Sequence, residues 1–296
     1  MTFQPIVIIG AGRSGTNMLR DMLTALDGVT TWPCDEINPV WKHGNLDRTD
    51  ALTTDDLRPD VRAYIRQSFA RRARVGGADV VVEKTCANSL RVGFVNAVLP
   101  EAKFVHLVRD GRDVTASAMK RWRSGVDLGY TLRKVRFVPP ADIPVYGVRF
   151  LANRLSQARS KERRLKVWGP TFDGLADYAA ENALDATCAK QWSVCVDSSD
   201  ADFASLDNER VVRVFYERLV RDPRGELERL CRLLGLTYDP ERLGPVLDNV
   251  STAGIGAWRG ALAHEQVAQL EAIAGETLKR HGYLNETAGL EKESRA

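Results

Sequence analysis

The chain has 296 residues, of which 44% are hydrophobic and 27% are charged, and its formal net charge at pH 7 is +3. This size and composition suit one large globular domain, and the small net charge gives no indication of a nucleic-acid partner. The five cysteines form no Cys-x-x-Cys pair, which favours reduced thiols over disulfides or a zinc site. The sequence contains no apolar run of roughly eighteen residues and no signal peptide, so we expect a soluble, cytoplasmic protein without a membrane span.

The first segment, residues 5–23, joins an apolar strand at 6–9 to a glycine-rich turn and an amphipathic helix. Gly10, Gly12 and Gly15 permit a tight turn, in which backbone N–H groups and the positive end of the helix dipole converge on an anion such as a phosphate. The turn also carries four polar side chains, Arg13, Ser14, Thr16 and Asn17. Taken alone, this pattern also fits a strand-to-helix turn without a ligand.

The turn differs from the loop that binds nucleoside triphosphates, which ends in Gly-Lys-Ser/Thr and uses the hydroxyl to hold magnesium. Here Thr16 follows Gly15 directly, and the cation comes earlier, at Arg13. The sequence therefore predicts a ligand whose terminal group is bound by a guanidinium and backbone amides, without a metal ion.

The alternation of helices and strands continues to residue 122. Apolar spacing predicts a helix at 56–73, a strand at 80–82, a helix at 88–99 and a strand at 104–108. Ligands of open parallel sheets lie beyond the carboxyl ends of the strands. We therefore expect three cations to meet at one sheet edge, where they can hold a polyanion: Arg13, Lys84 and Arg109.

The middle of the chain, about 121–200, has little periodicity and is typical of a lid or a substrate wall. Its basic run at 149–166 fits either a solvated helix face or the attraction of an anionic acceptor or membrane surface. Trp168 and Trp192 fit either stacking on an acceptor or core packing. The remaining elements are predicted as a strand at 211–215, a helix that begins at Pro223 and ends before Gly235, and a last helix at 265–281.

Two of these segments together resemble sulfotransferases that use 3′-phosphoadenosine 5′-phosphosulfate (PAPS) as donor. The glycine-rich turn is similar to the 5′-phosphosulfate loop of that family, and RDGRDVTAS is similar to its 3′-phosphate motif, with Arg109 followed eight positions later by Ser117. The resemblance extends to EKT at 83–85, to the run at 214–223 and to residues 251–258, with a gap at about 123–205.

We therefore predict an α/β protein with a three-layer, P-loop-like fold, in which helices cover both faces of a central parallel sheet of roughly four or five strands. A single domain would span residues 1–284, with a helical acceptor-binding insertion at about 121–205 and a polar tail at 285–296.

The resemblance also implies roles for individual residues. The donor would be bound by Gly12, Arg13, Ser14, Gly15, Thr16 and Asn17 at its 5′ end, by Arg109 and Ser117 at its 3′-phosphate, and by a further contact from Ser251. The cytosolic branch of the family has a catalytic His where this chain has Cys86. The protein-tyrosine sulfotransferase branch and related bacterial enzymes use a Glu shortly after the first helix, and CDEINPVW at 34–41 is similar to that region. Glu36 is therefore the candidate base, with Arg13 and Lys84 neutralising charge on the leaving group.

Each assignment has a structural alternative. Glu36 also fits a helix cap or a solvated surface acid, and His43 is the reserve base. His106 is expected to be a hydrogen-bonded strand residue. Lys84 also fits an ion pair with Glu83 or Asp110.

Two further alternatives concern the helix after the fourth predicted strand. Arg112 either contacts the donor or anchors the turn before this helix, and Asp110 and Asp113 resemble caps of the same helix.

The predicted activity is sulfonate transfer from PAPS to a hydroxyl of a sugar, lipid, small molecule or tyrosine, leaving 3′-phosphoadenosine 5′-phosphate (PAP) and requiring no metal. The alternatives are a magnesium-dependent nucleotide kinase on a related fold and an inactive nucleotide-binding protein. The sequence leaves the acceptor and the oligomeric state open.

Overall fold

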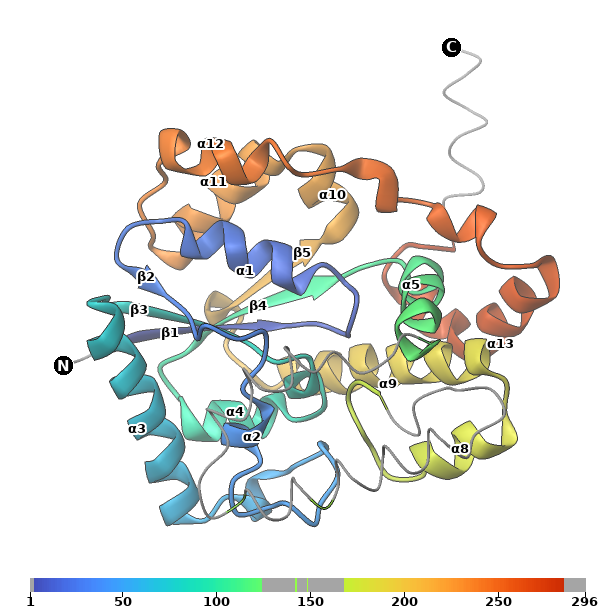
Figure 1. Ribbon diagram of the computed structural model, residues 1–296, viewed down its shortest axis with the longest axis horizontal. Coiled ribbons are helices and arrows are strands. Elements are labelled where there is room, and N and C mark those ends of the chain that lie inside the picture. The colour runs from blue at the N-terminus through green and yellow to red at the C-terminus, as the bar shows by residue number, and fades with distance from the viewer. Residues whose placement is uncertain (1–2, 124–141, 143–147, 149–167, 285–296) are drawn as a thin grey trace.

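The computed structural model describes residues 3–123, 142, 148 and 168–284. Within these residues, five parallel strands form a central sheet in the order β2-β3-β1-β4-β5 (Figure 1). The strands are β1 (Gln4–Ile9), β2 (Val29–Thr30), β3 (Val80–Lys84), β4 (Lys103–Val108) and β5 (Val211–Phe215).

Helices cover both faces of this sheet, because alternate side chains of each strand point to opposite faces and both faces are apolar. Ile6 and Ile8 of β1 pack toward α1, α11 and α12, whereas Val7 and Ile9 pack toward α3 and α4. The described helices are α1 (Thr16–Thr24), α2 (Asn38–Trp41), α3 (Pro59–Gly76), α4 (Val92–Val98), α5 (Gly111–Arg123), α8 (Leu175–Glu181), α9 (Leu184–Phe203), α10 (Tyr216–Arg221), α11 (Pro223–Leu234), α12 (Pro240–Leu247) and α13 (His264–Arg280).

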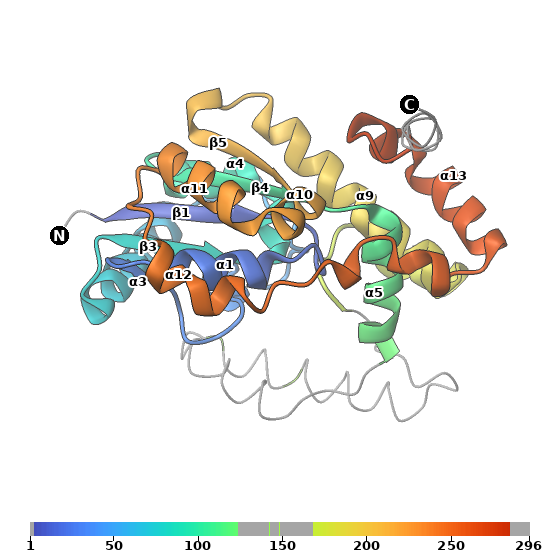
Figure 2. The same cartoon turned by 90° about the horizontal axis from the view of Figure 1, so that it is seen from above.

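A third apolar cluster lies where α9 packs against both α5 and α13 (Figure 2). Trp192 of α9 is buried there beside Trp122 of α5 and Leu270 of α13. Trp192 therefore belongs to the core, which is one of the two alternatives that the sequence left open.

The predicted three-layer α/β fold with a central parallel sheet is confirmed. The short edge strand β2 was not predicted, and the helix expected at 88–99 is divided into the 3-10 turn Cys86–Leu90 and α4. Pro223 opens α11 and Gly235 ends it in a left-handed conformation, as predicted. Within the described residues, no helix combines the length and the apolar character needed to cross a membrane.

The basic run at 149–166 lies outside the described residues, as do residues 124–141, 143–147 and 149–167 of the predicted insertion at 121–205. The last part of that segment forms α9, whose side chains pack into the third apolar cluster. An acceptor-binding role for the remainder stays a prediction.

Candidate functional site

The strand order brings the predicted cations to one edge of the sheet. β1 lies between β3 and β4. The turn after β1 is therefore flanked by Lys84, the last residue of β3, and by Arg109, the residue after β4. Parallel strands end at the same edge, so three segments distant in sequence converge there.

The turn between β1 and α1 has a backbone shaped for an anion. Gly15 has a φ of 95°, and a Cβ atom at this position would lie 2.6 Å from the ring of Tyr216. Arg13 has a φ of 75°, a left-handed conformation that is costly for a residue with a Cβ and that clusters at functional sites. The first N–H groups of α1, which begins at Thr16, lack intrahelical partners and carry the positive end of the helix dipole.

Two buried polar atoms at this turn have no hydrogen-bond partner among the described residues. They are Oγ of Ser14, which is 1% exposed, and Nε of Arg109, which is 8% exposed. Buried polar atoms are almost always hydrogen-bonded. Phosphate groups bound at this edge of the sheet would supply an acceptor for each atom, so these residues fit a phosphate-bearing ligand.

Arg109 joins the turn to a distant loop. Its guanidinium donates to the carbonyl oxygens of Arg13 at 3.0 Å and Gly254 at 2.6 Å, and it lies 4.2 Å from the centre of the Tyr216 ring. Ser117, the partner predicted for Arg109, accepts a hydrogen bond from Nε of Arg13 at 3.0 Å. The Arg13 side chain therefore bridges the residues predicted for the 5′ and 3′ ends of the donor.

The other predicted donor-binding residues lie around the same turn. A Cβ at Gly12 would lie 3.4 Å from the ring of Trp168, and Asn17 is exposed in the first turn of α1. Oγ of Ser251 accepts from the N–H of Ala253 at 3.2 Å and so caps the turn that contains Gly254.

The prediction that Asp113 caps α5 is wrong. Its carboxylate accepts hydrogen bonds from the backbone N–H groups of Gly256 at 2.8 Å and Trp258 at 2.9 Å, so Asp113 holds the distant loop. Asp110 does accept from the N–H of Arg112 at 2.9 Å, as a cap would.

The sequence left two roles open for Arg112, a donor contact and an anchor for the turn before α5. The structure shows contacts of the anchoring kind. Arg112 pairs with Asp110 at 2.9 Å and with Glu271 of α13 at 3.2 Å. These bonds fix the start of α5 against the last helix.

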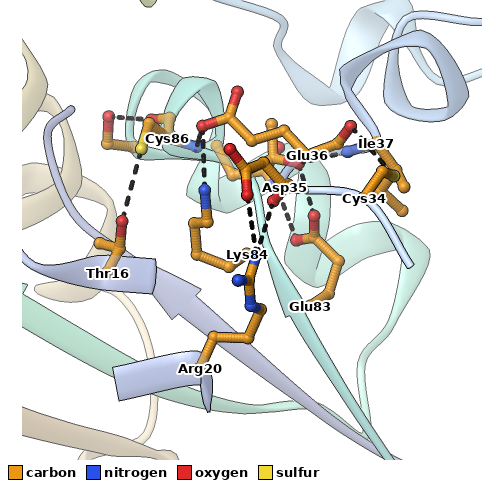
Figure 3. Close-up of polar contacts among 12 residues, drawn as sticks. Thr16, Arg20, Cys34, Asp35, Glu36, Ile37, Glu83, Lys84 and Cys86 are labelled. Carbon is orange, nitrogen blue, oxygen red and sulfur yellow. Dashed lines mark hydrogen bonds and ion pairs between the residues drawn. The ribbon is translucent and has the colours of Figure 1, made fainter. Parts of the chain in front are cut away.

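The predicted base and the predicted cation of β3 form an ion pair. Nζ of Lys84 lies 3.2 Å from Oε1 of Glu36, and their side chains are 3% and 24% exposed (Figure 3). Burial lowers the pKa of Lys84, but nearby negative groups, above all the Glu36 carboxylate, together more than offset this effect, and the pKa is raised above its usual value. The structure thus brings together Lys84 and Glu36, and the alternative of a solvated surface acid does not describe Glu36.

The loop that carries Glu36 is held from two sides. Arg20 of α1 donates to the backbone oxygen of Asp35 at 3.4 Å, and the N–H of Cys86 donates to Oε1 of Glu36 at 3.4 Å. Figure 3 shows these contacts converging on residues 34–37 from α1 and from the end of β3.

Cys86 occupies the place where the cytosolic sulfotransferases have their catalytic His, and it is buried. Its Sγ lies 3.6 Å from Oγ1 of Thr16. Burial and the nearby Glu36 carboxylate raise the pKa of the Cys86 thiol to about 12, so the group is an un-ionised thiol at neutral pH. Cys86 therefore packs the site and is a poor nucleophile or base.

Comparison with known proteins agrees with this geometry. The profile described as Sulfotransferase family matches residues 5–138 and 148–240, which is more than half of the chain. The chain belongs to the sulfotransferase family. It is 26% identical over 224 residues to omega-hydroxy-beta-dihydromenaquinone-9 sulfotransferase Stf3 of Mycobacterium tuberculosis, covering 74% of this chain and 44% of that relative. The chain thus spans less than half the length of this curated relative.

Solved sulfotransferase structures share the fold. The sulfotransferase domain from the curacin biosynthetic pathway has a TM-score of 0.57 at 14% identity, covering 94% of this chain and 98% of that domain. Mouse sulfotransferase SULT7A1, whose structure is a complex with PAP, has a TM-score of 0.50 at 13% identity, covering 93% of this chain and 85% of that one.

His43, the second candidate for the catalytic base, is engaged in other contacts. Nδ1 of His43 lies 3.0 Å from Oδ2 of Asp142, and the ring packs against Tyr64 with centroids 4.2 Å apart. His106 is a buried strand residue whose Nε2 lies 3.1 Å from Oγ of Ser199, as predicted. Both histidines thus have structural partners.

Tyr216 contributes to this site, although the sequence analysis assigned it no role. It stacks on Arg109, and its ring packs against Gly15. It follows β5 directly, and a polar residue at the carboxyl end of a parallel strand is the signal that singled out Lys84 and Arg109.

Proposed function

We propose that this chain transfers the sulfonate group of PAPS to a hydroxyl group of an acceptor. The observation that carries the proposal is the pair of Glu36 and Lys84, with 3.2 Å between carboxylate oxygen and ammonium nitrogen, beside a glycine-rich anion turn. Membership of the sulfotransferase family and the PAP complex of the mouse relative support the choice of donor.

The donor would lie along the edge of the sheet. Its 5′ end is assigned to Gly12, Arg13, Ser14, Gly15, Thr16 and Asn17. Its 3′-phosphate is assigned to Arg109 and Ser117, with Ser251 as a further contact from the loop beside Gly254. The unpartnered Ser14 Oγ and Arg109 Nε support this assignment, because the 5′- and 3′-phosphates would each supply an acceptor to one of them.

The chemistry follows from the positions of the charged groups. Glu36 takes the proton of the acceptor hydroxyl while the hydroxyl oxygen attacks sulfur. The bond from sulfur to the 5′-phosphate oxygen breaks, and its electron pair stays on that oxygen in PAP. As Glu36 becomes neutral, the Lys84 ammonium loses its partner just as negative charge grows on the leaving oxygen, which Lys84 and Arg13 then stabilise.

The acceptor class is proposed as a hydroxyl-bearing small molecule, lipid, sugar or tyrosine. The name of Stf3 describes a hydroxylated menaquinone as the compound on which that relative acts. Donor residues do not select an acceptor. A panel of 4-nitrophenol, N-acetylglucosamine and geraniol therefore samples phenol, sugar and lipid hydroxyls.

Calorimetric titration tests the donor assignment first. The protein is titrated with PAP in the presence of a chelator, and in parallel with ATP and magnesium. Tight binding of PAP without metal is the expected result. Binding of ATP only in the presence of magnesium would refute the proposal and favour a kinase.

Transfer is then measured with PAPS labelled with sulfur-35 and the acceptor panel, with Glu36→Gln as the matched variant. Labelled product that depends on Glu36 is expected. Binding of PAP without transfer to any panel member, and without release of PAP from PAPS, would contradict the enzymatic proposal in favour of an inactive nucleotide-binding protein.

A further inference from the structure

A buried hydrogen-bond chain lies behind the loop that carries Glu36. The N–H of Ile37 donates to Oγ1 of Thr85 at 3.1 Å, and the Thr85 hydroxyl donates to Oε1 of Glu83 at 2.5 Å. Ile37, Thr85 and Glu83 are each at most 1% exposed. Because these groups are buried away from bulk solvent, the N–H of Ile37 relies on the Thr85 hydroxyl for its hydrogen bond.

The chain of bonds continues and returns to the same loop. Nδ2 of Asn88 donates to the second carboxylate oxygen of Glu83 at 2.9 Å, and Nε of Arg91 donates to Oδ1 of Asn88 at 2.9 Å. Arg91 also donates to Oδ1 of Asn38 at 2.6 Å. The two residues that follow Glu36 are therefore both held by one network anchored in β3 and the turn after it.

Glu83 is the centre of this network. Burial raises the pKa of Glu83 to about 7, and the hydrogen bond from Thr85 opposes that rise. Buried networks of this kind are rigid when every member is satisfied and costly when one member is removed.

Three consecutive residues, 84–86, thus hydrogen-bond to Glu36 or to the next residue, Ile37. Lys84 and the N–H of Cys86 contact the Glu36 carboxylate, while the side chain of Thr85, between them in the sequence, holds the peptide N–H of Ile37. The Thr85 hydroxyl is engaged by the Ile37 N–H and by Glu83, so it acts on Glu36 through the backbone of the adjacent residue.

We infer that Thr85, supported by Glu83, is a positioning residue that fixes the Glu36 carboxylate against Lys84. This inference rests on the proposed function of Glu36 as the base. Displacing a catalytic carboxylate by about 1 Å can slow the catalysed reaction on the order of 100-fold, so the position of this loop matters for turnover.

The test compares two variants of Thr85 with a control. Thr85→Val keeps the shape but removes the hydroxyl, and Thr85→Ser keeps the hydroxyl. The control, Thr187→Val, removes a buried hydroxyl that donates to the Ala183 carbonyl within α9. If the Thr85→Val variant does not fold, Thr85→Ala is used instead.

Turnover and amide exchange are both measured. We expect kcat of Thr85→Val to fall by roughly 10- to 100-fold on the labelled-PAPS assay, with PAP affinity within about twofold of the wild type. Hydrogen–deuterium exchange of the peptide spanning 34–38 should become about tenfold faster or more, because the Ile37 amide loses its partner. Thr85→Ser and Thr187→Val should match the wild type in both measurements.

A double variant separates this inference from the proposed function. If Thr85 acts through Glu36, Glu36→Gln/Thr85→Val should be within about twofold of Glu36→Gln alone. The inference would be overturned, with Glu36 still the base, by either of two results. One is a loss of turnover in the double variant equal to the product of the two single losses, and the other is unchanged hydrogen–deuterium exchange at 34–38 in Thr85→Val. Wild-type turnover of Glu36→Gln would instead overturn the base assignment, and this inference with it.

Discussion

Replacing Arg109 with alanine tests the assignment of the 3′-phosphate site. In the structure its guanidinium donates to the carbonyls of Arg13 and Gly254 and stacks on Tyr216. A charge-assisted hydrogen bond contributes about 1.5–3 kcal/mol, so loss of one phosphate contact should weaken PAP binding about 10- to 150-fold. Adenosine 5′-monophosphate lacks the 3′-phosphate, so its affinity should change far less.

Arg210→Ala is the matched control for this experiment. Arg210 also donates to a backbone carbonyl, that of Ala102, at 2.9 and 3.0 Å, and it lies over the ring of Phe104, but at the opposite end of β4. Both variants should lose folding stability, whereas only Arg109→Ala should lose PAP affinity. Calorimetry with both nucleotides distinguishes the two roles of Arg109. An equal loss of affinity for PAP and adenosine 5′-monophosphate would show that Arg109 only holds the two loops together.

The remaining predictions concern the base, the neighbouring thiol and acid stability. Glu36→Gln should slow sulfonate transfer roughly 100-fold or more while calorimetry gives nearly unchanged PAP affinity, because only the proton acceptor is lost; wild-type turnover would contradict this. Cys86→Ser should keep turnover within about threefold in the same assay, because the buried group is an un-ionised thiol; complete loss in a folded variant would contradict it. Burial lowers the pKa of His106 from 6.5 to about 3, so between these values the unfolded chain binds a proton that the folded chain does not. Denaturant titrations should therefore show the unfolding constant rising by up to about tenfold per pH unit as pH falls from 6.5, with a shallower slope in His106→Gln, and equal slopes would refute the assignment.

The sheet and the anion turn were predictable because their signals are local. The largely apolar runs at 6–9, 80–82, 104–108 and 211–215 are short, and each is part of a strand of the sheet. β2 escaped detection because two paired residues at a sheet edge leave no periodic pattern. The convergence of Lys84 and Arg109 on the turn needed only the rule that parallel strands end at one edge.

The position of Glu36, in contrast, could not be predicted from local sequence patterns. No period or motif in residues 31–37 indicates that this carboxylate lies against Lys84, and only the family resemblance suggested it. Its place depends on bonds between residues far apart in sequence, such as the 3.1 Å contact of Ile37 with Thr85. Such contacts leave no spacing signal, because each is made by one backbone group and one side chain.

Helix α9 was missed for a reason that also concerns the site. It is enclosed by α5, α13 and the turn after β3, and its buried residues include polar ones such as Gln191 and Ser199 as well as Trp192. A helix buried on several faces does not show one apolar stripe, so its period is weak. Those polar residues are satisfied by partners on other elements, for example Gln191, whose amide donates to the carbonyls of Trp168 and Pro170 at 2.8 Å. Because Trp168 in turn lies against Gly12, the buried amide of Gln191 connects α9 to the anion turn.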